Sequence, residues 1–112
     1  MASKSIEELI GKTRLSKLAS LAGFSLGLTC GALHALEIDI PLGAELAANV
    51  TTTMTRAVSD GIYERDYGRV LNKNDFPFVR GATIGAWANT IITSFGYIIG
   101  YVAVNIVKKK FR

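Results

Sequence analysis

The sequence has few of the residues on which catalytic, metal and redox sites depend. Its 112 residues include one cysteine, Cys30, and one histidine, His34. A single cysteine excludes a disulfide framework and the paired-cysteine motifs of zinc and redox sites. No nucleophile–histidine set, paired carboxylates, P-loop or dinucleotide fingerprint is present in the sequence. We therefore expect the protein not to be an enzyme and to need no cofactor.

Proline and charge are also scarce. Two prolines exclude a polyproline or collagen-like stalk. Only 20% of the residues are charged and 49% are hydrophobic, which excludes an intrinsically disordered chain. The length allows one domain at most, so we expect residues 1–112 to form a single membrane-embedded unit.

Charge is missing altogether from two stretches, residues 18–36 and 81–107. As helices they would be about 29 and 40 Å long, against a hydrocarbon core of about 30 Å. Each therefore predicts a transmembrane helix. A buried soluble hairpin is the alternative, but the short, charge-rich remainder of the chain cannot cover two uncharged helices on all sides. A cleaved signal peptide is the alternative for the first stretch, yet its apolar region exceeds the usual length of roughly 7–15 residues.

The charge is distributed unevenly along the chain. The basic N-terminal segment, residues 1–17, has net charge +2, the loop 37–80 has −2, and the basic tail, 108–112, has +4. Lys and Arg mark the cytoplasmic side of membrane proteins. The pattern thus predicts an integral membrane protein with both termini on the cytoplasmic side, or on the matrix or stromal side in an organelle.

The loop contains an amphipathic segment at about residues 42–66. Leu42, Leu46, Val50, Met54, Val58 and Ile62 recur every four residues, which is the spacing of one helix face. We expect Leu46, Val50, Met54 and Val58 to be buried by neighbouring chains or lipid headgroups. On the opposite face, we expect Glu45, Thr52, Arg56 and Ser59 to be solvent-exposed. The predicted fold is all-α, a two-pass transmembrane helical hairpin with an amphipathic helix in its connecting loop.

Small residues form a continuous face on each predicted span. Such faces let two helix backbones approach closely, so that dispersion replaces the hydrophobic drive that lipid removes. We expect them to mediate helix packing, either within the hairpin or between subunits. The packing residues are Ala19, Gly23, Gly27, Gly31 and Ala35 in the first span, and Gly81, Gly85, Asn89, Thr93, Gly96, Gly100 and Ala103 in the second.

A few polar residues have alternative interpretations. His34 is placed within a membrane helix and could ligate haem or a pigment, but a second ligand would have to come from another chain. Pairing with Glu37 or Asp39 is the favoured interpretation, and we expect no metal site. The basic tail is predicted to touch anionic lipid headgroups rather than nucleic acid. Its basic residues are Lys108, Lys109, Lys110 and Arg112.

Three functions are compatible with this pattern. The first is a structural subunit that packs through its Gly/Ala-rich helix faces into a homo-oligomeric or filamentous lipid-containing assembly, like a pilin or a virion membrane protein. The second is an accessory subunit of a respiratory, photosynthetic or ATP-synthase complex. The third is a holin-like pore former, for which the loop is long. The expected partners are membrane lipid and either other copies of the chain or subunits of a larger membrane complex.

Overall fold

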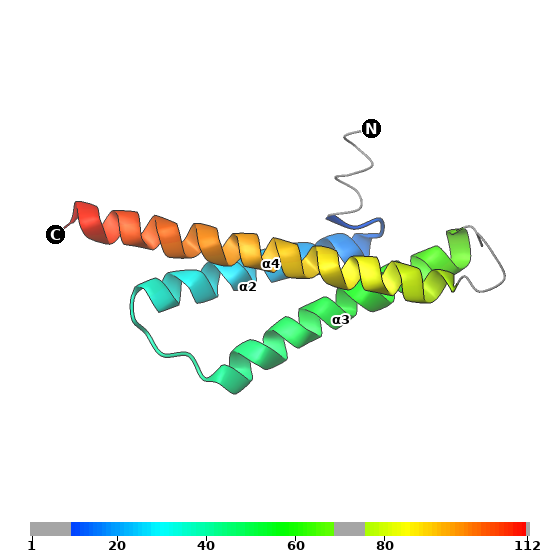
Figure 1. Ribbon diagram of the computed structural model, residues 1–112, viewed down its shortest axis with the longest axis horizontal. Helices are drawn as coiled ribbons and strands as arrows, with labels where there is room; N and C mark the ends of the chain where they lie inside the picture. Colours follow the sequence, from blue (N-terminus) through cyan, green and yellow to red (C-terminus); the bar gives the residue numbers. More distant parts are fainter. Residues whose placement is uncertain (1–9, 69–75, 112) are drawn as a thin grey trace.

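The computed structural model describes residues 10–68 and 76–111, and this part of the chain contains three long helices and no strand. They are α2 (Arg14–Ala35), α3 (Leu42–Tyr67) and α4 (Pro77–Lys110), packed side by side in an elongated bundle (Figure 1). The expected all-α fold is confirmed. Helices α2 and α4 are long and apolar enough to cross a membrane.

Local sequence sets the helix ends. The Thr13 side chain accepts a hydrogen bond from the Ser16 backbone N–H at 3.0 Å, so α2 begins four residues before the expected position 18. Pro77 occupies the first turn of α4, where its missing N–H costs nothing. Gly68 ends α3, and its N–H donates to the Glu64 carbonyl. The amphipathic segment expected at 42–66 is thus a helix one residue longer.

The direction of the helices differs from the expected hairpin. Gly23, Gly27 and Gly31 of α2 lie in turn against Asn89, Thr93, Tyr97 and Tyr101 of α4, in the same order along the chain. Helices α2 and α4 are therefore parallel, whereas the two helices of a hairpin are antiparallel. The return path is α3, which runs antiparallel to both (Figure 1). Its 26 residues give it a length of about 39 Å, enough to follow the whole of α2.

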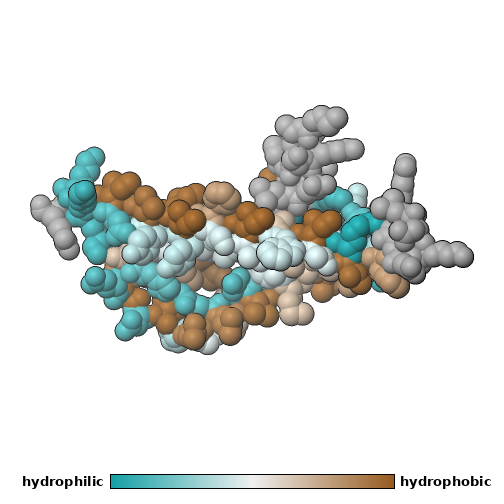
Figure 2. All heavy atoms as spheres, in the orientation of Figure 1, coloured by the Kyte–Doolittle hydropathy of each residue, from teal (hydrophilic) through white to brown (hydrophobic). Residues whose placement is uncertain are grey.

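The interior of the bundle is small and polar. Among the described residues, the buried hydrophobic side chains are those of three alanines, Ala19, Ala35 and Ala88. Serines, glycines, Asn89 and an Arg56–Asp60 pair occupy the rest of the interior. The large apolar side chains point outward instead, and Figure 2 shows them along the outer edges of α3 and α4. A water-soluble domain has the reverse arrangement, because burial of large apolar side chains is what stabilises it.

The orientation of α3 corrects one expectation. Arg56 and Ser59, predicted to be solvent-exposed, are 0% and 6% exposed. Thr52 and Glu45 are half-buried. The four apolar residues Leu46, Val50, Met54 and Val58 are exposed on the single chain, so their burial by lipid or a neighbour stays a prediction. The polar face turns inward because it meets serines on α2 and glycines on α4.

Candidate functional site

The glycines of α2 bring its backbone against that of α4. A Cβ atom at Gly27 would collide with the Thr93 carbonyl oxygen, and one at Gly31 with the Tyr97 carbonyl oxygen. Because backbone cannot move aside as a flexible side chain can, only glycine fits these two positions. This contact is a backbone seam between two parallel helices.

The small residues of α4 serve two different neighbours. Gly96 and Gly100 face the backbone of α2 at Phe24 and Leu28. Gly81 and Gly85, nearer the start of α4, face α3 instead, where an added Cβ at Gly85 would lie 2.6 Å from an Asp60 carboxylate oxygen. A helix of 34 residues is long enough to meet α3 with its first turns and α2 with later ones.

The structure therefore places most of the predicted packing residues at contacts within the chain. Thr93 is half-buried, and its side chain faces Gly23. Ala103 is exposed, so the structure does not bring it into the bundle. The remaining ten are buried: Ala19, Gly23, Gly27, Gly31, Ala35, Gly81, Gly85, Asn89, Gly96 and Gly100.

A charged cluster is buried where the three helices meet. Arg56 Nε donates to Asp60 Oδ2 at 2.8 Å, and Arg56 Nη1 donates to Ser20 Oγ at 2.6 Å. The Ser16 hydroxyl donates to the other Asp60 carboxylate oxygen. The sequence did not predict this cluster, because Arg56 was expected to lie on the solvent-exposed face of α3. Two signals point to it, the four-residue spacing of Arg56 and Asp60 and the two serines one turn apart on α2.

Asn89 is fully buried beside this cluster. Its Nδ2 lies 3.4 Å from Thr53 Oγ1, which is long for a hydrogen bond. Its Oδ1 has no hydrogen-bond partner among the described residues. Asn89 therefore makes one long interhelical hydrogen bond, through only one end of its amide.

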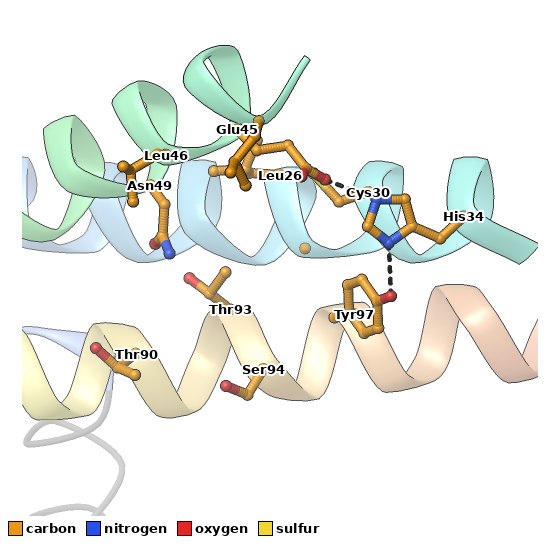
Figure 3. A pocket seen from close by; sticks show the side chains of 12 residues that line it. Leu26, Cys30, His34, Glu45, Leu46, Asn49, Thr90, Thr93, Ser94 and Tyr97 are labelled. Atoms are coloured by element: carbon orange, nitrogen blue, oxygen red, sulfur yellow. Dashed lines mark hydrogen bonds and ion pairs between the residues drawn. The ribbon is translucent and has the colours of Figure 1, made fainter. Parts of the chain in front are cut away.

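A second polar cluster lies toward the other end of the bundle. His34 Nδ1 is 2.6 Å from the Tyr97 hydroxyl, and His34 Nε2 is 2.9 Å from Glu45 Oε1 (Figure 3). The partner is thus Glu45, which lies across the turn between α2 and α3, rather than the expected Glu37 or Asp39. With both ring nitrogens engaged, His34 has none turned toward a haem iron or pigment. The described residues contain no group of three or more side chains that could hold a metal ion.

A cavity of about 350 Å³ adjoins this second cluster. Side chains from all three helices surround it (Figure 3). Its polar lining consists of Cys30, His34, Glu45, Asn49, Thr90, Thr93, Ser94 and Tyr97, and its apolar lining includes Leu26, Leu42 and Leu46. We call it the His34 cavity. Cavities of this size between the helices of a bundle are of the kind that binds small molecules.

The basic tail is partly engaged by the bundle. Lys108 Nζ donates to the Ala35 carbonyl oxygen at 2.8 Å, at the C-terminal end of α2. A cation is favourable there because it meets the negative end of the helix dipole. Lys109 and Lys110 are exposed, and Arg112 lies outside the described residues.

Comparison of the chain with protein-family models, with curated proteins and with solved structures finds no match.

Proposed function

We propose that this protein is a structural subunit of a membrane assembly, and that all three of its long helices cross the bilayer. The observation that carries the proposal is the inverted distribution of side chains. Within residues 10–68 and 76–111, the interior holds alanines, glycines and polar groups, whereas 27 large hydrophobic residues are exposed on the outside. A surface of this kind is stable only when lipid or other subunits cover it.

The parallel course of α2 and α4 favours three crossings over two. Two parallel helices that both span the bilayer must be joined by a segment that returns through it. Helix α3 has the length to do so, and the two charged residues between positions 46 and 62, Arg56 and Asp60, are turned toward its neighbours rather than toward lipid. Charged residues within membranes almost always face a bundle interior and pair with one another.

Three crossings place the termini on opposite sides of the membrane. The side that carries segments 1–17 and 63–80 has eight Lys and Arg residues, and the side that carries 36–45 and 108–112 has four. The positive-inside rule then assigns the N-terminus to the cytoplasmic side and the C-terminus to the other. This proposal replaces the expectation that both termini share one side.

The proposed assembly role rests on the surfaces that are not used for packing within the chain. The glycine seam lies between helices of one chain, so it is not free for a neighbouring subunit. The outward rows remain, including Leu46, Val50, Met54 and Val58 on α3. Their four-residue spacing along α3 gives a continuous apolar stripe that suits either acyl chains or the matching stripe of another subunit.

Cysteine accessibility tests the number of crossings. In a Cys30→Ser background, single cysteines are placed by Ser3→Cys, Ile38→Cys and Lys110→Cys, and sealed vesicles are treated with a membrane-impermeant maleimide. We expect Cys at position 3 to label from one side, and Cys at positions 38 and 110 from the other. Labelling of positions 3 and 110 from the same side would contradict three crossings and restore the hairpin.

Particle mass tests the assembly role. We expect the detergent-extracted particle, measured by native mass spectrometry, to weigh an integral multiple of the 12.1 kDa chain. A large particle with other polypeptides would instead favour an accessory subunit of a membrane complex. A monomer at all mild detergent concentrations would contradict the assembly role without affecting the topology.

A further inference from the structure

The His34 cavity is not needed for helix packing. The glycine seam holds α2 against α4, and the Arg56–Asp60 cluster holds α3 against both. Around the cavity, by contrast, Glu45 of α3 contacts His34 of α2 at 2.9 Å, while Leu42, Leu46 and Asn49 of α3 line the free space (Figure 3). The cavity is open at the surface, where Leu42, Leu46 and Ser94 are exposed, so a small molecule can enter it from outside the bundle.

The charge around the cavity has one sign. Of the twelve lining residues, Glu45 has the only side chain with a full formal charge at pH 7 when His34 is neutral. The Glu45 side chain is 20% exposed and contacts His34 through Oε1, with Cys30 beside it. A cation that contacts this carboxylate gains an electrostatic attraction that a neutral molecule does not.

The rest of the lining divides by polarity. Leu26, Leu42 and Leu46 form an apolar part, contributed by α2 and by the first two turns of α3. Hydroxyl groups of Thr90, Ser94 and Tyr97 line the part contributed by α4. The cavity therefore offers one anionic group, several neutral hydrogen-bonding groups and an apolar surface within one space.

We propose that the His34 cavity binds a small amphiphilic amine. The ligand's protonated nitrogen contacts the Glu45 carboxylate, and its hydrocarbon part lies against the leucines. A cation near a partly buried carboxylate gains far more than it would in water, and the matched neutral molecule gains nothing from that charge. The experiments below read out the single cysteine, Cys30, so they test this site separately from the assembly role and the number of membrane crossings.

Cys30 lines the cavity and reports on its occupancy. It is half-buried, and it is the only cysteine of the chain, so every thiol modification occurs at this one position. The full chain in nonionic detergent micelles is treated with a cationic reagent, 2-aminoethyl methanethiosulfonate, or an anionic one, 2-sulfonatoethyl methanethiosulfonate. Intact-mass spectrometry follows the modification rate.

Charge selectivity is the first result expected. Glu45→Gln should lower the ratio of the cationic to the anionic rate about tenfold, since it removes the charge and keeps the side-chain shape. Glu37→Gln is the matched control, because Glu37 is exposed and does not line the cavity. It should leave the ratio unchanged. An equal ratio in the unaltered chain and in Glu45→Gln would overturn the proposal.

Protection by a ligand is the second result, and it needs no variant. Hexylammonium should slow modification of Cys30 by an uncharged methanethiosulfonate, whereas 1-hexanol at the same concentration should not. Circular dichroism in the same micelles verifies that neither additive unfolds the helices. Equal protection by amine and alcohol, or none by either, would show that the carboxylate does not select a cation and would overturn the proposal.

Discussion

The two ends of the bundle each contain a paired carboxylate, and the two pairs are built differently. At one end the Arg56 side chain is fully buried, and serines from α2 complete the hydrogen bonds of the pair. At the other end the His34 side chain is 35% exposed, and the His34–Glu45 pair borders a cavity. We call these the closed end and the open end. A pair sealed on all sides fixes helix positions, whereas a pair that borders free space can exchange partners.

The difference has a physical origin in the residues around each pair. Glycines at positions 81 and 85 let α4 approach Asp60 of α3 at the closed end. At the open end Thr93, Ser94 and Tyr97 of α4 line the His34 cavity, and the α4 glycines of that stretch, Gly96 and Gly100, face α2 rather than α3. Side-chain size on one helix thus determines whether a polar pair is enclosed or accessible.

Breaking the pair at the closed end should have the largest effect. Asp60→Leu leaves the buried Arg56 guanidinium without its carboxylate, which typically costs about 3–5 kcal/mol. We expect this loss in the free energy of unfolding, measured by circular dichroism during titration of sodium dodecyl sulfate into mild micelles. Asp66→Leu is the control, because the Arg65–Asp66 pair is exposed and such pairs contribute about 0–1 kcal/mol. Equal losses from the two variants would contradict the assigned role of the closed end.

Filling the closed end should have an intermediate effect. Gly85→Ala adds one carbon that would lie 2.6 Å from an Asp60 oxygen, so α3 and α4 must separate slightly. We expect a loss of about 1–3 kcal/mol in the same titration. Gly43→Ala is the matched control near the open end, since nothing lies within 4 Å of its added carbon and alanine favours the helix. The comparison fails if both glycines tolerate alanine equally.

Neutralising the open end should have the smallest effect on stability. Glu45→Gln removes a charge from a pair that is partly exposed, so we expect a change of about 0–1 kcal/mol. The same variant is expected to change the charge selectivity at Cys30 strongly. A loss as large as that of Asp60→Leu would mean that both ends are structural and that the distinction between them is wrong.

Much of the secondary structure could be predicted from the sequence, because helix length and apolar spacing are local properties. The absence of charge from 18–36 and 81–107 indicated two helices, and the four-residue spacing in 42–66 indicated the third. The direction in which α3 faces could not be obtained this way. Periodicity defines two faces of a helix but does not say which face is inside. The apolar face is buried when the surroundings are water, and it can face outward when they are lipid.

The polar contacts were harder to predict than the helices. His34 and Glu45 are separated by ten residues that include a turn. The acidic residues nearest to His34 in the sequence are Glu37 and Asp39, so these two were the expected partners of His34. Glu37 has a positive φ of 61° just after the end of α2 and belongs to the turn rather than to the bundle. The glycine positions could be found by spacing, but their partners depended on the direction of α3.

The enclosed pair on α3 has a consequence for how the chain is made. Arg and Asp each oppose membrane insertion by roughly 2.5–3.5 kcal/mol at the centre of an isolated helix. Helix α3 would therefore enter the bilayer poorly when it leaves the ribosome, with only the serines of α2 available to it. The glycines that receive Asp60 belong to α4, which is synthesised after α3. Under the proposed topology, α4 determines whether α3 crosses at all, so the insertion of α3 waits until α4 has been synthesised.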